Sequence, residues 1–440
     1  MVTDPLASWL LEQEARAMLT RLGRVRPFVL HETMVPAAAL LPRAQAGIER
    51  YLVTGRRELR GLIQGFLAWL RSPAAAQATA EQAQRRFALL RLKFNAVLTQ
   101  FDLFNAVITQ RSENEIGVWM SGLDILCADA LSLPGDYYEV PPIICYLDRG
   151  VGAAIRRART RLPGGGSNPV SIVRVPRERM VGSGIASSLV HEVGHQAASL
   201  LDLVPSLRPL LRGMQRGNAS ERDAWVLWER WISEIVADFW SVARLGVCST
   251  FGLMGVVSLP RPFVFRLSLD DPHPVPWFRV KLSCAMGDVL YPDAQWQQLA
   301  ALWERMYPAR GLDPERRRLF AQLEATMPGF VALLVHHRPQ MLRGRSLVEG
   351  LDVVQRQPAQ LARLFERWSR EPSAMYRAAP TLVFAVLGQA RGRGAITPEN
   401  ESELVAKLLG FWALRSTLDM SSACAIAGQS GLATAMRIAA

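Results

Sequence analysis

The stretch that decides the fold lies near the middle of the chain and reads Ile185-Ala-Ser-Ser-Leu-Val-His191-Glu192-Val-Gly-His195-Gln-Ala-Ala-Ser-Leu-Leu201. His191 and His195 are four residues apart, so a helix places both imidazoles on one face, close enough to bind one metal ion. Glu192 carries the only formal charge in the stretch, which predicts a helix that is largely buried. A buried carboxylate beside two imidazoles needs a partner or a metal. The stretch therefore predicts a buried metal-binding helix.

A second segment, Trp231-Ile-Ser-Glu234-Ile-Val-Ala-Asp238-Phe-Trp-Ser-Val-Ala243, is the best source of a third metal ligand. Its only charges are Glu234 and Asp238, which are spaced i,i+4 among bulky apolar residues, so one helix offers both carboxylates from one face. Glu221 and Glu229 are competing third ligands, but neither is followed by an acid four residues later. A catalytic zinc site needs that third protein ligand and one open position for water.

The ends of this second helix are also indicated by the sequence. Ser220 has Asp223 three residues after it, a capping-box-like arrangement that predicts the start of the helix. Gly246 predicts its end.

Here the sequence resembles the gluzincin zinc metallopeptidases, whose pattern is HExxH on one helix and ExxxD on the next. The resemblance implies that His191, His195 and Glu234 bind a Zn2+ cofactor. It further implies that Glu192 is the general base toward a metal-activated water, and that Asp238 hydrogen-bonds a ligand imidazole and so fixes its tautomer.

A weaker resemblance lies at Asp271-Pro-His273-Pro-Val-Pro-Trp-Phe-Arg279, which is similar to the His-Pro…Arg element of gluzincins related to the CAAX prenyl endopeptidases. It implies that His273 and Arg279 stand near the zinc as catalytic residues and polarise the scissile carbonyl or hold an acid. The alternative interpretation is a Pro-rich loop in which His273 is a turn residue. The chain lacks the transmembrane helices of those relatives, so their substrates are not expected here. The likeness covers roughly residues 140–290.

The N-terminal part of the chain predicts a long helix. Residues 79–116 contain neither Gly nor Pro, and their large apolar residues fall three and four apart, on one stripe of a helix that packs in a bundle. The stripe consists of Phe87, Leu90, Phe94, Val97, Phe101, Phe104 and Ile108.

Two short segments predict a small sheet. Residues 141–147 and 170–175 are rich in β-branched residues and bounded by Pro and Gly, so both are predicted strands. Pro176 predicts an edge strand, because proline cannot donate to a ladder. We expect this edge, residues 171–177, to bind an extended peptide as one more strand.

The expected fold is mostly α, of the α+β class. A helical N-terminal region, 1–120, precedes a zincin-like metallopeptidase core, 121–290, which contains the small sheet and the two metal-binding helices. A helical C-terminal region, 291–440, follows. The flanking regions could select substrates or dock to a protein partner.

Composition sets further bounds. Half of the 440 residues are hydrophobic and a fifth are charged, which excludes a disordered or collagen-like chain. The net charge is +12, with Arg residues spread along the chain. Neither this charge nor the Arg156–Arg161 cluster indicates nucleic-acid binding, because solvent-exposed Arg side chains explain both. No secretory signal and no apolar run of 18 residues is visible, and the five cysteines form no CxxC pair. We expect a cytoplasmic protein, or one exported without an N-terminal signal.

These observations predict a zinc metalloendopeptidase, a hydrolase acting on peptide or protein substrates. The alternative is a non-catalytic scaffold that keeps a structural zinc site. An intact Glu192 argues against that alternative, because a structural site has no need of a base.

Overall fold

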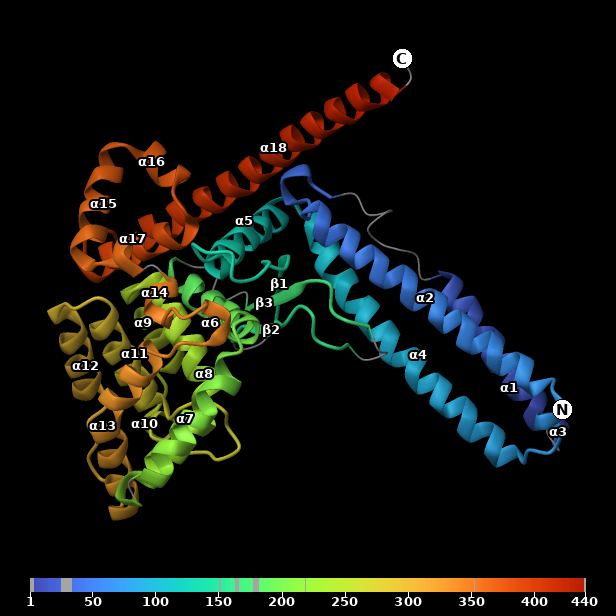
Figure 1. Ribbon diagram of the computed structural model, residues 1–440, viewed down its shortest axis with the longest axis horizontal. Helices are drawn as coiled ribbons and strands as arrows, with labels where there is room; N and C mark the ends of the chain where they lie inside the picture. The colour runs from blue at the N-terminus through green and yellow to red at the C-terminus, as the bar shows by residue number, and fades with distance from the viewer. Residues whose placement is uncertain are drawn as a thin grey trace. The chain divides into compact units, whose positions relative to one another are not determined.

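The computed structural model describes residues 4–24, 34–149, 152–162, 166–176, 182–217, 219–351 and 353–438 (Figure 1). The fold is mostly helical with one small sheet, which confirms the predicted class. The N-terminal helices are α1 (Pro5–Arg24), α2 (Pro42–Leu70), α3 (Pro73–Ala76), α4 (Ala80–Thr109) and α5 (Asn114–Leu131), and the strands are β1 (Ile143–Asp148), β2 (Ala154–Arg156) and β3 (Ser171–Pro176). The central helices are α6 (Gly184–Leu200), α7 (Leu203–Gly217), α8 (Arg222–Leu245), α9 (Val247–Val257), α10 (Arg261–Val264) and α11 (Pro276–Leu290). The C-terminal helices are α12 (Ala294–Met306), α13 (Pro314–Val335), α14 (Leu347–Leu351), α15 (Pro358–Arg370), α16 (Pro372–Arg377), α17 (Pro380–Gly392) and α18 (Pro398–Ile438).

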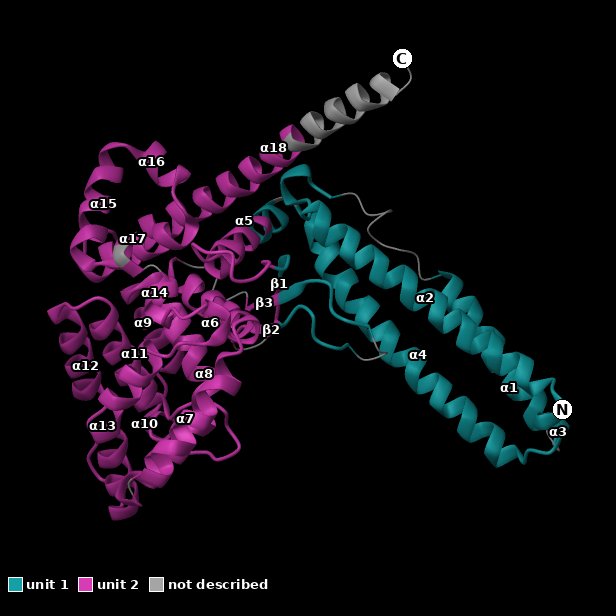
Figure 2. Cartoon of the chain, viewed as in Figure 1, with its two compact units in different colours: residues 1–120, 141–146, 156–172 teal, residues 121–140, 147–155, 173–440 magenta. Residues whose placement is uncertain are grey.

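The chain divides into two compact units (Figure 2). Unit 1 contains residues 1–120, 141–146 and 156–172, and unit 2 contains residues 121–140, 147–155 and 173–440. The two units are groups of residues that contact one another more than they contact the rest of the chain. The three regions expected from the sequence, 1–120, 121–290 and 291–440, stay a prediction.

Unit 1 is built around the predicted long helix. The helix α4 begins at a capping box, in which the Thr79 side chain accepts from the Gln82 backbone N–H and the Gln82 side chain accepts from the Thr79 backbone N–H. Every residue of the predicted stripe is buried, from Phe87 to Ile108. The helix ends at Thr109, where a short 3-10 turn follows, so residues 110–116 do not continue it.

The predicted strands are present, but the predicted edge is wrong. The sheet order is β1-β3-β2, so β3 lies in the middle. Pro176 is the last residue of β3, where a missing N–H ends the pairing and does not interrupt it. A peptide cannot add to a central strand, so the expected strand addition along 171–177 fails, and Arg177 lies outside the described residues. The edges are β1 and β2.

Unit 2 is organised around α8, which contacts α6, α7, α9, α11, α13 and α17. Its indole rings fill the interior: Trp228 stacks on Phe330 at 4.7 Å between ring centroids, and Trp240 donates from Nε1 to the Ala130 carbonyl at 2.9 Å. Among the described helices, α13 alone is long and apolar enough to cross a membrane by length and composition, and 44% of its apolar window is buried inside the protein.

The two ends of α8 agree with the sequence only in part. Gly246 ends the helix with a φ of 57°, as predicted. The start was predicted wrongly. A 3-10 turn over Ala219–Glu221 precedes the helix, and Glu221 occupies the N-cap position without a capping hydrogen bond from its side chain, so Ser220 and Asp223 are not the capping pair.

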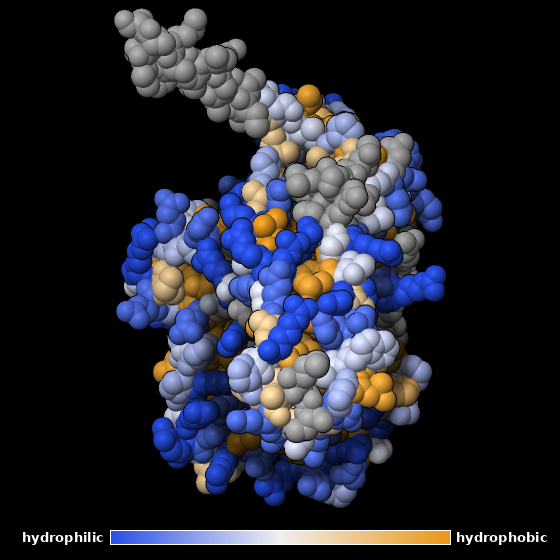
Figure 3. Space-filling model, turned by 90° about the vertical axis from the view of Figure 1, so that its right-hand side faces the viewer, coloured by the Kyte–Doolittle hydropathy of each residue, from blue (hydrophilic) through white to orange (hydrophobic). Residues whose placement is uncertain are grey.

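The surface carries both polar and apolar residues. On the face of the molecule in Figure 3, hydrophilic residues surround small groups of hydrophobic ones. Scattered exposed apolar residues of this kind are normal in folded proteins.

Candidate metal centre

The helix α6 carries the HExxH segment and is buried along most of its length, as predicted. Its first residues are held by side chains of the C-terminal helices α17 and α18. Ser183, the N-cap residue, donates from its hydroxyl to Glu401 Oε1 at 2.6 Å, and Arg391 lies 3.3 Å from Glu401 Oε2. Glu401 is fully buried. These contacts hold the start of α6 in place.

A glycine sets how closely α6 approaches α8. A Cβ atom at Gly194 would lie 2.8 Å from Ala237 Cα and 3.0 Å from both the Ala237 carbonyl oxygen and Trp240 Cβ. Only glycine fits this contact without moving a helix. Because Gly194 stands between the two histidines of α6, and Ala237 stands between Glu234 and Asp238 of α8, the two sets of polar side chains are brought to one place.

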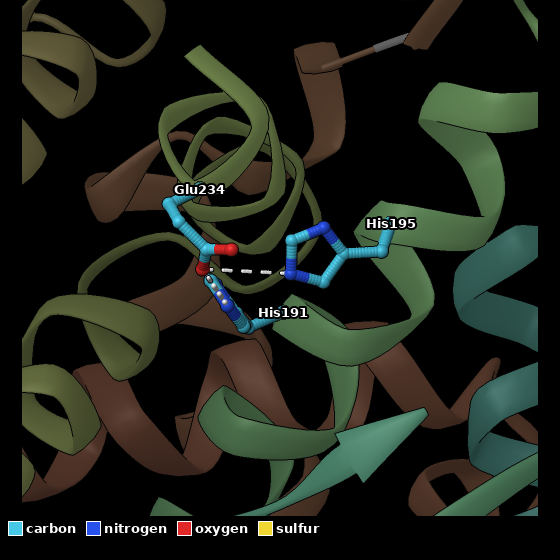
Figure 4. A group of neighbouring side chains, drawn as sticks. All are labelled: His191, His195 and Glu234. Atoms are coloured by element: carbon cyan, nitrogen blue, oxygen red, sulfur yellow. Dashed lines mark ion pairs between the residues drawn. The ribbon is translucent and has the colours of Figure 1, made fainter. Parts of the chain in front are cut away.

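The donor atoms of His191, His195 and Glu234 converge (Figure 4). The imidazole Nε2 atoms of His191 and His195 lie 3.3 Å and 3.5 Å from Glu234 Oε2, and the three donor atoms all lie within 4.8 Å of one another. Two ligands of a tetrahedral zinc ion, each bonded at its usual length, are about 3.3–3.5 Å apart. Ordinary N–H···O hydrogen bonds cluster near 2.9–3.0 Å. The donor set therefore fits a metal ion better than it fits direct hydrogen bonding.

Asp238 connects His191 to Arg279. Its Oδ1 lies 2.8 Å from His191 Nδ1, and it accepts two hydrogen bonds from Arg279, one from Nε to Oδ2 at 2.6 Å and one from an Nη to Oδ1 at 2.8 Å. A carboxylate at Nδ1 keeps a proton on that nitrogen and directs the Nε2 lone pair of the neutral ring toward Glu234. This is the contact that the gluzincin resemblance implied for Asp238. Its role at a metal stays a prediction.

The buried charges shift one another's pKa values. Burial raises the pKa of Glu234, but hydrogen bonds from His191, His195 and His273 lower it far more, so the carboxylate is ionised. Burial lowers the pKa of His191, yet the charge of Asp238 and the hydrogen bonds to Asp238 and Glu234 raise it to about 9.

His273 also reaches this cluster, from the loop between α10 and α11. Its Nε2 lies 3.1 Å from Glu234 Oε2, and its Nδ1 lies 2.7 Å from Asp271 Oδ1. The side chain is 44% exposed, unlike the helix-borne histidines. Asp271 also accepts a hydrogen bond from the backbone N–H of His273, so it fixes both the loop and the ring.

Arg279 lies on α11, within its first turns, and its guanidinium is held by Asp238. The sequence left two interpretations of this residue open, polarising a carbonyl or holding an acid. The observed contacts correspond to the second.

Glu192 borders a small cavity beside the cluster. The cavity has a volume of about 130 Å³ and is also lined by His191, His273 and Arg279. Its other lining residues include five serines: Ser187, Ser188, Ser241, Ser249 and Ser283. The carboxylate of Glu192 is half-buried at this opening and lies on the same helix as the two candidate ligands.

The competing third ligands lie elsewhere. Glu229 accepts from Arg212 Nε at 2.7 Å and from Gln215 Nε2 at 2.7 Å, both on α7. Glu221 accepts from Trp225 Nε1 at 3.3 Å. Of the three candidates, Glu234 is the one that approaches the histidines.

Sequence reasoning missed two partners of this site. Asp271 stands two residues before His273 in the segment already singled out, and a short acid before a turn is a known signal for such a local hydrogen bond. Glu401 lies 218 residues from Ser183, and no local pattern pointed to it.

Within the described part of the chain, His191, His195 and Glu234 form the one group of three or more His, Cys, Asp or Glu side chains whose ligand atoms converge in this way. Comparisons with protein-family models, with curated proteins and with solved structures found no match for the chain.

Proposed function

We propose that the protein is a zinc-dependent metallopeptidase of the gluzincin type. The observation that carries the proposal is the separation of the donor atoms, 3.3 Å and 3.5 Å from Glu234 Oε2 to the two histidine Nε2 atoms. Two histidines and one carboxylate are the protein ligands of one well-known class of catalytic zinc site, which keeps its fourth position open.

The ion would supply a Lewis acid and an acidified water to this site. The chain supplies the remaining chemistry. Glu192 borders the cavity together with His191, and its carboxylate would take a proton during attack on a peptide carbonyl and return it to the leaving amine. His273 is half-exposed at the opening of the site, where its imidazole can donate to the developing oxyanion.

Asp238 and Arg279 act through His191. Arg279 lowers the pKa of Asp238, although burial raises it, and thereby keeps the carboxylate ionised beside His191 Nδ1. The fixed imidazole would then hold Nε2 toward an ion without rotating. Neither residue needs to touch the substrate.

The test pairs metal analysis with peptide cleavage. We expect about one zinc per purified chain, and cleavage of a peptide library that a chelator abolishes. Glu192→Gln should retain zinc and lose cleavage, by a factor of about 10²–10⁴ for a general base. Glu234→Gln should lose zinc, whereas Glu229→Gln, on the same helix but facing Arg212, should retain both zinc and cleavage.

Two outcomes would contradict the proposal. A chain that binds no zinc would remove the metal site altogether. A chain that binds zinc through His191, His195 and Glu234 but cleaves no peptide would be the non-catalytic scaffold.

A further inference from the structure

A large apolar cavity lies at the N-terminal end of α8, and we call it the α8 cavity. Its volume is about 700 Å³, within the ~300–1,000 Å³ range typical of ligand pockets. Val226 and Leu227 of α8, Leu267 and Leu269 of the loop after α10, and Leu319 of α13 form its apolar lining. Val226 is 44% exposed and Leu269 is 59% exposed, so apolar surface faces water in a concave site.

The helix α8 connects this cavity to the candidate metal centre. Leu227 precedes Glu234 by seven residues and Asp223 precedes it by eleven, which correspond to two and three helical turns. Both residues therefore lie on the same face of α8 as Glu234, about 10 Å and about 16 Å away along the axis. Arg230 lies on this face between them and is exposed, so solvent reaches the surface that joins the two places.

The loop after α10 connects the same two places independently. Leu267 and Leu269 line the α8 cavity, and His273, four residues after Leu269, reaches Glu234 Oε2 at 3.1 Å. A ligand that occupies the cavity and the metal centre together would follow this one face of α8 and this one loop.

We propose that the α8 cavity is a specificity subsite that takes a large apolar side chain of an extended peptide substrate. This inference rests on the proposed function. An extended chain rises about 3.3 Å per residue, so the 10–16 Å along α8 places this side chain about three to five residues from the bond that is cut.

The charges at the cavity argue for a neutral occupant. Asp223 and Glu315 lie at its wall together with Arg318, so an occupant of either charge would lie near a side chain of the same sign. The leucine side chains then decide which residue is accepted, through the apolar surface that it buries.

The test uses a peptide library of fixed cleavage site in which each flanking position is varied. The wild-type chain should prefer Leu, Phe or Met over Ala at one position three to five residues from the cleaved bond. Leu269→Asn and Leu319→Asn should each lower kcat/KM for the preferred peptide about tenfold, which is the usual effect of losing an apolar contact in a substrate pocket. Cleavage of the Ala peptide, whose side chain leaves the cavity unfilled, should fall less in both variants than cleavage of the preferred peptide.

Leu259→Asn is the matched control, because Leu259 is 43% exposed and lies outside the cavity lining. It should keep the wild-type preference. A direct measurement uses the Glu192→Gln chain, in which binding of the fluorescent preferred peptide should weaken when Leu269→Asn is added.

The results separate the two proposals. The subsite proposal would be wrong if the chain cleaved peptides without any apolar preference at these positions. It would also be wrong if the preference survived in both cavity variants. Either result would leave the proposed function unaffected. Absence of cleavage by the wild-type chain would overturn both.

Discussion

Replacing Gly194 by alanine adds one methyl group at the closest approach of α6 to α8. The new Cβ would lie 2.8 Å from Ala237 Cα, whereas ordinary contact of a Cβ begins at 3.4 Å. The atom it meets is backbone, which cannot rotate away. The helices must therefore separate locally by about 0.6 Å, since close-packed interiors offer no empty space to absorb the change.

This displacement is large for a metal site. Ligand distances in such sites hold to within about 0.2 Å, and His191 and His195 flank Gly194 on the displaced helix. We expect zinc affinity to fall by about 100-fold, at the upper end of the effect of disturbing the residues that orient metal ligands. The free energy of unfolding should change less. Overpacking lowers it by about 1–3 kcal/mol, and the exchange of glycine for alanine inside a helix raises it by about 1 kcal/mol.

Gly213→Ala supplies the control. Gly213 lies inside α7, is exposed, and has no heavy atom within 4 Å of its added Cβ. It should raise stability by about 1 kcal/mol and leave zinc affinity unchanged. Zinc affinity is measured by competition with a coloured chelator, and stability by urea unfolding followed by circular dichroism. If Gly194→Ala bound zinc within twofold of the wild type, the close approach would not be what positions the ligands.

Three further predictions test other parts of the structure. Asp238→Asn should weaken zinc binding about 10- to 100-fold in the same chelator competition, and unchanged affinity would show that this carboxylate does not orient a ligand. Glu401→Ala should lower the free energy of unfolding by about 2 kcal/mol, because the buried hydroxyl of Ser183 and the half-exposed guanidinium of Arg391 lose their partner. Glu403→Ala, on the exposed face of α18, is the control and should change this free energy by less than about 0.5 kcal/mol. Burial lowers the pKa of His337 below its usual 6.5, so the unfolded chain binds a proton at a higher pH than the folded chain does. The free energy of unfolding therefore decreases as the pH falls from 6.5 through the pKa of His337 in the folded chain. His337→Gln should reduce this acid-side loss in urea titrations from pH 7 to pH 5, and His336→Gln, at an exposed position, should follow the wild type.

The parts of the fold that the sequence predicted are those with local causes. The i,i+4 spacing of His191 and His195, and of Glu234 and Asp238, predicted the two helices and the faces they share. The lack of charge around these residues predicted burial. The stripe from Phe87 to Ile108 predicted α4 for the same reason, because its period is that of a helix.

What the sequence could not predict depends on partners far along the chain. Pro176 suggested an edge strand, yet only the pairing of β3 with both neighbours decides its place, and that pairing is not local. Ser183 and Glu401 meet across 218 residues. The position of His273 depends on a loop without periodicity, where Asp271 and Glu234 hold the imidazole at both nitrogens. The motif predicted metal-binding chemistry, whereas no motif marks the α8 cavity, to which we assign substrate choice only as a proposal.

The contacts around His191 explain why the candidate centre needs little rearrangement to take up an ion. Arg279 holds Asp238 through two hydrogen bonds, and Asp238 holds His191 at Nδ1, so this ring is fixed by groups that do not belong to the ligand set. Burial lowers the pKa of His191, but the charge of Asp238 and the hydrogen bonds to Asp238 and Glu234 raise it to about 9. A proton would therefore compete with an ion for the Nε2 lone pair of His191. Affinity then depends on how firmly α6 and α8 hold their separation, which is why one methyl group at Gly194 should matter more than any change in the exposed loop.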